Sequence, residues 1–177
     1  MRIIAGERRG AKIAAPKGET TRPTSDRVRE AAYNLIGPVE NAAVLDLFAG
    51  SGGMGLEALS RGARRCVFVE SDRAACAVIR GNLEKLRLTA ALVLQKDAFQ
   101  ALREERGAGR AYDLVLVDPP YDSWFDLAPR LAEALPAALA PDGQLVVETS
   151  ARVEPALPLT RVTSRRYGSA RITLFTR

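Results

Sequence analysis

The sequence of 177 residues contains no histidine. This absence excludes Ser-His and Cys-His nucleophilic catalysis, histidine-ligated metals and imidazole acid–base chemistry. The two cysteines, Cys66 and Cys76, lie in apolar surroundings without the spacing of metal ligands, so we expect buried, reduced thiols and no metal ion. Any chemistry must therefore use carboxylates, backbone groups, aromatic rings and a bound reagent.

Long apolar runs are also missing. None could span a bilayer, and residues 1–9 lack the apolar core and cleavage site of a signal peptide. An apolar content of 47% in 177 residues is typical of a globular protein with one full core. We therefore expect a cytoplasmic protein that does not associate with membranes.

The net charge of +5 is unevenly distributed along the chain. Residues 1–30 carry a balance of +4 and residues 156–177 a balance of +5, which leaves −4 for the middle of the chain. Basic surface attracts phosphate backbones at long range. The segregation of positive charge to both ends therefore favours a nucleic-acid partner over ordinary solubilising charge.

Apolar periodicity predicts an N-terminal unit followed by alternating strands and helices. Residues 2–5 and 10–14 indicate a hairpin, residues 15–24 a loop, and residues 25–36 a capped helix. Strands are expected at 43–48, 65–70, 91–95, 112–118 and 143–148. Helices are expected at 53–61, 72–87, 97–106 and 124–140, and a terminal hairpin at 159–165 and 171–176.

Continuous apolar strands such as residues 114–117 indicate a parallel sheet that helices cover on both faces. We predict an α/β fold with a small N-terminal hairpin and helix over residues 1–37 and a Rossmann-like domain over residues 38–177. In such sheets, ligands bind beyond the carboxyl ends of the strands.

A glycine-rich turn follows the first predicted strand. Gly50, Gly52 and Gly55 satisfy G-x-G-x-x-G, and Glu70 ends the next strand, where a ribose-binding acid is expected. This pattern alone fits a nicotinamide dehydrogenase as well as a methyltransferase. Asp46, just before the glycines, would repel a pyrophosphate but suits S-adenosylmethionine, which carries a sulfonium and an ammonium group.

Asp97 follows the third predicted strand. Its carboxylate can accept a hydrogen bond from an adenine amino group, and it can equally cap the helix that begins at residue 98. The two roles are compatible, so Asp97 supports S-adenosylmethionine as the cofactor.

The fourth predicted strand runs into Asp118-Pro119-Pro120-Tyr121. Consecutive prolines fix the local path, so the Asp118 carboxylate and the Pro119 carbonyl can both face outward as acceptors. Two adjacent acceptors match the two N–H donors of an exocyclic amino group and direct its lone pair toward an electrophile. The tetrapeptide therefore predicts methylation of an amino nitrogen, without a strong base.

Three aromatic residues lie at or just after this tetrapeptide. We expect Tyr121 to offer its ring to a base removed from its stack. Trp124 and Phe125 open a predicted helix, where apolar residues are usually buried, so we expect both in the core.

These residues resemble the RsmD family, whose members methylate the N2 amino group of a guanine in 16S ribosomal RNA. The most distinctive match is Thr21 to Ala31, followed by Asn34. Similar segments are found at residues 1–6, 9–10, 46–52, 55–63, 118–121 and 167–168. Gly53-Met54 and Ser169-Ala170 depart from the family pattern at positions to which we assign no role.

The resemblance implies a Rossmann-like methyltransferase fold of seven strands with an antiparallel last strand. It also implies methylation of guanine 966 within the small ribosomal subunit, and a segment Thr21–Arg29 that folds over the cofactor and helps to receive RNA. We expect the protein to be a monomer. The expected cofactor residues are Asp46, Ala49, Gly50, Ser51, Gly52, Gly55, Glu70, Ser71, Asp97, Ala98 and Thr24. The expected RNA contacts are Arg8, Arg9, Lys12, Arg22, Arg27, Arg29, Arg165 and Arg166.

Other functions remain open at this point. The tetrapeptide also fits an adenine-N6 DNA methyltransferase, although the chain leaves little room for a DNA-reading domain. The glycine fingerprint fits a nicotinamide-dependent oxidoreductase, and the basic ends fit a non-catalytic RNA-binding protein. Asp118, rather than asparagine, argues against a protein-glutamine methyltransferase.

Overall fold

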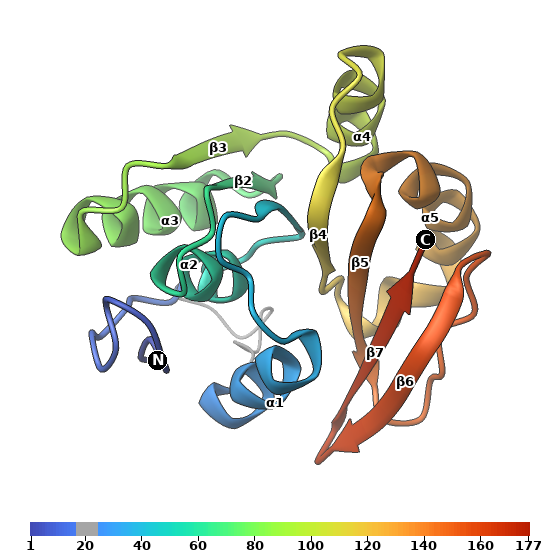
Figure 1. The fold of residues 1–177 in the computed structure, drawn as a ribbon, viewed down its shortest axis with the longest axis horizontal. Helices are drawn as coiled ribbons and strands as arrows, with labels where there is room; N and C mark the ends of the chain where they lie inside the picture. Colours follow the sequence, from blue (N-terminus) through green and yellow to red (C-terminus); the bar gives the residue numbers. More distant parts are fainter. Residues whose placement is uncertain (17–24) are drawn as a thin grey trace.

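The computed structural model describes residues 1–16 and 25–177. Within these residues lies one seven-stranded sheet of order β3-β2-β1-β4-β5-β7-β6 (Figure 1). The strands are β1 (Ala43–Leu47), β2 (Arg65–Glu70), β3 (Ala91–Gln95), β4 (Tyr112–Val117), β5 (Leu139–Ser150), β6 (Thr160–Tyr167) and β7 (Ala170–Thr176). The first five are parallel, and β7 is antiparallel to both of its neighbours. The predicted fold class is confirmed.

The helices lie close to their predicted positions. They are α1 (Asp26–Ile36), α2 (Gly53–Ser60), α3 (Arg73–Leu86), α4 (Ala98–Gly107) and α5 (Trp124–Ala138), with a 3-10 turn η1 (Tyr121–Ser123). Ser25 caps α1, because its hydroxyl accepts a hydrogen bond from the amide of Val28 at 3.3 Å. Gly37 ends α1 with a φ of 83°, a conformation that favours glycine.

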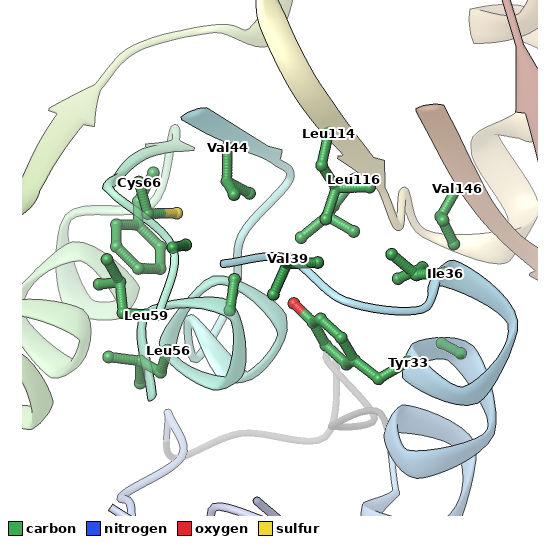
Figure 2. Close-up of a cluster of buried hydrophobic side chains, with 14 of the residues drawn as sticks. Tyr33, Ile36, Val39, Val44, Leu56, Leu59, Cys66, Leu114, Leu116 and Val146 are labelled. Carbon is green, nitrogen blue, oxygen red and sulfur yellow. The ribbon is translucent and has the colours of Figure 1, made fainter. Parts of the chain in front are cut away.

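Two cores lie on opposite faces of the sheet. The first joins α1, α2 and α3 to the sheet, and Figure 2 shows Tyr33 and Ile36 of α1 near Leu114, Leu116 and Val146 of the sheet. The second core joins α4 and α5 to the opposite face. β1 is buried along its whole length, which explains why all of its residues except Asp46 are apolar. The face that carries α1 is called the α1 face below.

The N-terminal segment forms the predicted hairpin in a short form. Arg2 and Lys12 form an antiparallel bridge, and the amides of Ile3 and Ile13 donate to the carbonyls of Ala11 at 3.0 Å and Met1 at 3.1 Å. The helix α2 takes other backbone donors of the same segment. The amides of Ile4 and Ala5 donate to the carboxylate of Glu57 on α2, at 2.8 and 2.9 Å.

The same segment approaches α2 closely at Gly6. Its φ of 81° favours glycine, and a Cβ there would lie 1.8 Å from the backbone oxygen of Ser60. The Ser60 hydroxyl also donates to the Ala5 carbonyl at 2.6 Å. Residues 1–16 therefore lie directly on the helix that follows the glycine loop.

In residues 1–16 and 25–177, no helix combines the length and apolar character that a membrane crossing requires. No cluster of three or more cysteine, aspartate or glutamate side chains suited to a metal ion occurs in the same residues.

Candidate functional site

Acidic side chains stand at or just beyond the carboxyl ends of the five parallel strands. In sheet order they are Asp97 after β3, Glu70 on β2, Asp46 on β1, Asp118 after β4 and Glu148 on β5. The chain proceeds from β1 toward β2 on one side and reaches β4 on the other. A ligand crevice is expected at such a switch point, between Asp46 and Asp118.

Three of these acids share one face of the sheet. Asp46 is paired with Phe68 and Leu116, whose side chains belong to the core on the α1 face. Side chains alternate along a strand, so Glu70 shares the face of Phe68, and Glu148 that of Val146. The sheet therefore directs Asp46, Glu70 and Glu148 toward the α1 face.

The glycine loop between β1 and α2 is a tight turn with an unusual backbone. Phe48, Gly50 and Gly52 have φ values of 58°, 54° and 77°. This region is uncommon for a bulky residue such as Phe48, so the loop is locally strained. The Ala49 amide donates to the Val69 carbonyl at 3.1 Å, which fastens the turn to β2.

Two of the predicted cofactor acids hold this loop in place. The Glu70 carboxylate accepts hydrogen bonds from the amides of Gly50 at 2.8 Å and Asp72 at 2.9 Å. The Asp46 carboxylate accepts one from the amide of Gly55 at 2.9 Å. Both acids therefore shape the backbone on which a ligand would rest.

Asp46 is almost completely buried, with 3% of its surface exposed. Burial raises the pKa of its carboxyl group to about 8, and the nearby Glu70 adds to the effect, although the hydrogen bond from Gly55 opposes it. A cation placed beside Asp46 would favour the ionised form. The site therefore suits a positively charged ligand better than a phosphate.

The glycines of the fingerprint have different surroundings. A Cβ on Gly55 would lie 2.3 Å from Cε1 of Phe68, and one on Gly52 would lie 3.2 Å from Ile79. These two glycines allow α2 to pack against the sheet and α3. A Cβ on Gly50 would meet nothing nearer than the Phe48 oxygen at 4.0 Å. Gly50 is thus the glycine of this loop that has open space beside it.

Asp97 caps α4, as one of its two predicted roles requires. Its carboxylate accepts hydrogen bonds from the amides of Phe99 at 3.0 Å and Gln100 at 3.1 Å, both on Oδ1. The adenine contact stays a prediction. Of its predicted neighbours in the cofactor site, Ala98 is buried at the start of α4 and Ser71 is exposed after β2.

Asn82 of α3 is a residue that the sequence did not single out. It is buried, and its side-chain amide donates to the carbonyl oxygens of Ala14 at 3.0 Å and Ser51 at 3.3 Å. Its Oδ1 accepts from the Ala14 amide at 2.8 Å. Asn82 therefore joins the glycine loop to the N-terminal segment. The sequence signal that could have identified Asn82 is a polar residue among the apolar positions of α3.

The predicted catalytic tetrapeptide forms the connection between β4 and α5. Pro119 is buried and Pro120 is exposed, and the Pro120 carbonyl accepts a hydrogen bond from Ser123 at 2.9 Å, within the turn η1. The Tyr121 hydroxyl donates to Oε1 of Glu148 at 2.8 Å. The tetrapeptide is therefore linked to the neighbouring strand β5 as well as to β4.

Glu148 is a second residue that the sequence did not single out. It is 8% exposed and follows the apolar run 145–147. The same pattern, an apolar strand that ends in an acid, drew attention to Asp46 and Asp118. Glu148 could have been found by applying it to the fifth strand.

The aromatic residues after the tetrapeptide separate into two environments. Trp124 is 3% exposed and belongs to the core under α5, so its predicted burial is confirmed. The prediction that Phe125 is a core residue is wrong, because its side chain is 72% exposed. Phe125 follows Trp124 on the helix, and α5 buries only one of its faces.

Arg29 contradicts the prediction that it contacts RNA. Its side chain is completely buried, with an ion pair to Asp26 at 2.9 Å and another to Glu57 at 3.5 Å. It also donates to the carbonyl of Arg2. Arg29 joins α1 to the N-terminal segment and to α2.

The other basic residues have different environments. Arg8 is partly buried, and its Nε donates to the Leu86 carbonyl at 2.7 Å. The remaining described candidates are exposed: Arg9, Lys12, Arg27, Arg165 and Arg166. Arg22 and Thr24 lie outside the described residues.

The sheet order, the antiparallel β7 and the motifs after β1 and β4 define a Rossmann-like methyltransferase fold. The chain belongs to the family described as conserved hypothetical protein 95, whose model matches residues 1–176. Relatives in this family carry the name ribosomal RNA small subunit methyltransferase D, so the predicted RsmD membership is confirmed.

Two relatives illustrate this similarity. The ribosomal RNA small subunit methyltransferase D of Escherichia coli is 43% identical over 122 residues, which cover 68% of this chain and 60% of that protein. The Haemophilus influenzae protein of the same name is 36% identical over 154 residues, which cover 84% of this chain and 78% of that protein.

The solved structures agree with this assignment. The structure of yhhF from Escherichia coli has a TM-score of 0.84 and 34% identity, and the match covers 100% of this chain and 97% of that one. A more distant structure, SMU.776 complexed with S-adenosylhomocysteine, shares the fold with a TM-score of 0.72 at 16% identity.

Proposed function

We propose that this protein transfers a methyl group from S-adenosylmethionine to the exocyclic N2 amino group of a guanine in small-subunit ribosomal RNA. The observation that carries the proposal is the position of Asp118-Pro119-Pro120-Tyr121. It follows β4 directly beside the strand whose glycine loop would hold the cofactor. Two relatives named as methyltransferases of this RNA support the substrate.

The cofactor half of the site is formed by β1, β2 and β3. We propose that the loop 49–52 lies along the ligand, with Gly50 as the point of closest approach. Glu70 and Asp97 stand at the next two strand ends and would accept hydrogen bonds from the ribose hydroxyls and the adenine amino group. Asp46 would supply the negative charge that balances the cationic ligand.

The bound cofactor supplies an electrophilic methyl group on a positively charged sulfur. The Asp118 carboxylate and the Pro119 carbonyl would accept the two hydrogens of the amino group and turn its lone pair toward that methyl. Transfer of that methyl, with the electrons of the C–S bond left on sulfur, would place a positive charge on the nitrogen. Asp118 would stabilise this charge and then accept the released proton.

The RNA half of the site would lie over β4, β5 and the basic ends of the chain. Tyr121 is placed to present its ring to the target base. We further propose that residues 1–37 act as an extension that covers the cofactor and contacts RNA, and residues 38–177 as the catalytic domain. The hydrogen bonds from Asn82 to both Ser51 and Ala14 connect the cofactor loop to that extension.

The decisive experiment is methyl transfer to small ribosomal subunits that lack the modification, followed by mass mapping of the RNA. Asp118→Ala should lower turnover by roughly a hundredfold or more, the effect typical of removing a group that stabilises transition-state charge. Binding of S-adenosylhomocysteine should persist, because Asp118 lies on the substrate half. Asp142→Ala, at an exposed position of β5, is the matched control.

Normal turnover of Asp118→Ala would contradict the proposed role of the tetrapeptide. Transfer to adenine in duplex DNA, without transfer to subunits, would instead establish the alternative DNA activity. Calorimetry with S-adenosylhomocysteine and with NAD tests the cofactor independently.

A further inference from the structure

We infer that Glu148 determines base specificity, because its carboxylate accepts the N1–H of the target guanine while it also holds the Tyr121 hydroxyl. This inference rests on the proposed function and deepens it. It assigns to β5 the residue that distinguishes guanine from other bases that carry an amino group.

The position of Glu148 places it beside the reacting group. β4 and β5 are parallel, and Val117 is paired with Val147. The residues that follow this pair are Asp118 after β4 and Glu148 on β5. Neighbouring strands lie about 4.8 Å apart. The N1 and N2 atoms of guanine are closer together than this, so the two side chains would converge on the edge of one base. Glu148 is only 8% exposed, so it is not one of the solvent-exposed charges that merely keep a surface soluble.

The bond between Tyr121 and Glu148 ties the proposed stacking residue to the proposed reading residue. The Tyr121 hydroxyl lies 2.8 Å from Oε1 of Glu148. Glu148 would therefore help to position the Tyr121 ring, and with it the edge of a base stacked on that ring. An ionised carboxylate has about four lone-pair positions on its two oxygens, so it can accept from Tyr121 and from a base together.

The Watson–Crick edge of guanine supplies the matching chemistry. Guanine presents N1–H and the N2 amino group side by side as donors, whereas the N1 of adenine is an acceptor. If Asp118 and Pro119 hold the two hydrogens of the N2 amino group, the adjacent N1–H requires a further acceptor. A carboxylate there favours guanine and opposes an unprotonated N1, because two acceptors would face each other.

The test compares two bases on each enzyme. Small subunits are reconstituted with RNA that carries either guanine or 2-aminopurine at the target nucleotide. 2-Aminopurine keeps the N2 amino group but has an unprotonated N1. Wild-type enzyme should prefer guanine by roughly ten- to a hundredfold in kcat/KM, the range that one specific base-edge contact supplies.

Glu148→Gln keeps the size of the side chain and an acceptor for Tyr121, and its amide can donate to an unprotonated N1. The guanine preference should therefore fall to within about threefold or reverse, since the base-edge contact is lost. Tyr121→Phe removes the hydroxyl bond but keeps Glu148, so it should slow both substrates and leave the preference near that of the wild type. Each preference is a ratio from one preparation, so a partly unfolded variant does not alter it.

An unchanged guanine preference in Glu148→Gln, with an active wild-type enzyme, overturns this inference alone. The same holds if Tyr121→Phe loses the preference as fully as Glu148→Gln, because Glu148 would then act only through Tyr121. A wild-type enzyme that methylates neither RNA overturns the proposed function and this inference with it.

Discussion

Arg29 and Glu57 form a completely buried ion pair, in which Nε of Arg29 lies 3.5 Å from Oε2 of Glu57. Glu57 also accepts hydrogen bonds from the backbone amides of Ile4 and Ala5 and pairs with Arg61 at 2.8 Å. One carboxylate on α2 thus fastens α1 and the first residues of the chain to the helix that follows the cofactor loop. This charge acts together with the hydrogen bonds that Ser60 and Asn82 make to Ala5 and Ala14.

Glu57→Gln should destabilise the protein by about 3–5 kcal/mol, because it removes the buried negative charge that Arg29, Arg61 and two backbone amides share. Urea unfolding followed by circular dichroism measures the change. Glu84→Gln, at an exposed position of α3, is the matched control and should change stability by less than about 0.5 kcal/mol. Equal stability of the two variants would show that Glu57 does not hold the extension.

Asp46 should make the stability of the ligand-free protein depend on pH. Its pKa is about 8 in the folded protein, above the ordinary value of 3.8. Between these values the folded state binds more protons than the unfolded state, so stability falls as the pH rises toward 8. The expected slope is about 1.4 kcal/mol per pH unit within this window, relative to Asp46→Asn.

The comparison is made by urea unfolding of wild type and Asp46→Asn at pH 5 and pH 8. Asparagine keeps an acceptor for the Gly55 amide but carries no titrating proton, so it should gain on the wild type as the pH rises. A difference between the two proteins that does not change with pH would contradict the raised pKa. Saturating S-adenosylmethionine should reduce the difference, because a cation favours ionised Asp46.

Alanine substitutions of two fingerprint glycines should affect different properties, stability at Gly55 and ligand binding at Gly50. Gly55→Ala should lower stability by several kcal/mol, since its Cβ would lie 2.3 Å from Phe68 in a packed core. Gly50→Ala should cost only about 1–2 kcal/mol, the strain of a left-handed alanine. It should nevertheless weaken binding of S-adenosylhomocysteine more than tenfold, because its Cβ would occupy the space in which we propose that the ligand lies.

Thermal unfolding and calorimetry on the two variants separate these effects. If Gly50→Ala binds S-adenosylhomocysteine as the wild type does, the ligand does not approach the loop at Gly50. If Gly55→Ala folds with normal stability, α2 does not depend on the close contact with Phe68.

Periodicity predicted most of the fold, because the central strands are buried on both faces and each neighbouring helix buries one of its own faces. Prediction failed where one long-range contact decides the outcome. Arg29 looks like a basic residue on a helix surface, but Glu57, 28 residues away in the sequence, gives it a buried partner in addition to Asp26. Phe125 was placed in the core from its apolar character, but Trp124 already fills the buried side of the first turn of α5.

The candidate site was predictable to a similar extent. Acids at strand ends are visible in the sequence, and parallel strands bring such ends to one edge. The link between Tyr121 and Glu148 was not predictable, because it depends on the adjacency of β4 and β5 in the sheet.

Arg165 and Arg166 offer a final test of where RNA lies, because the strand places them on opposite faces. Arg165 is paired with Ile172, which is in turn paired with Glu148, so the three residues form one row across β6, β7 and β5 on the α1 face. Arg166 is paired with Arg171 and points to the other face. An RNA that enters over Tyr121 and Glu148 should therefore contact Arg165 and not Arg166.

Arg165→Ala should weaken RNA binding and reduce the slope of log affinity against log salt by about 1, as the loss of one phosphate contact predicts. Arg166→Ala removes the same charge from the same strand and should leave the slope near that of the wild type. Filter binding of small subunits across a salt series measures both variants. If the two slopes fall equally, the effect comes from net charge alone. If only Arg166→Ala reduces the slope, the RNA approaches over α4 and α5, and the assignment of the α1 face to the substrate is wrong.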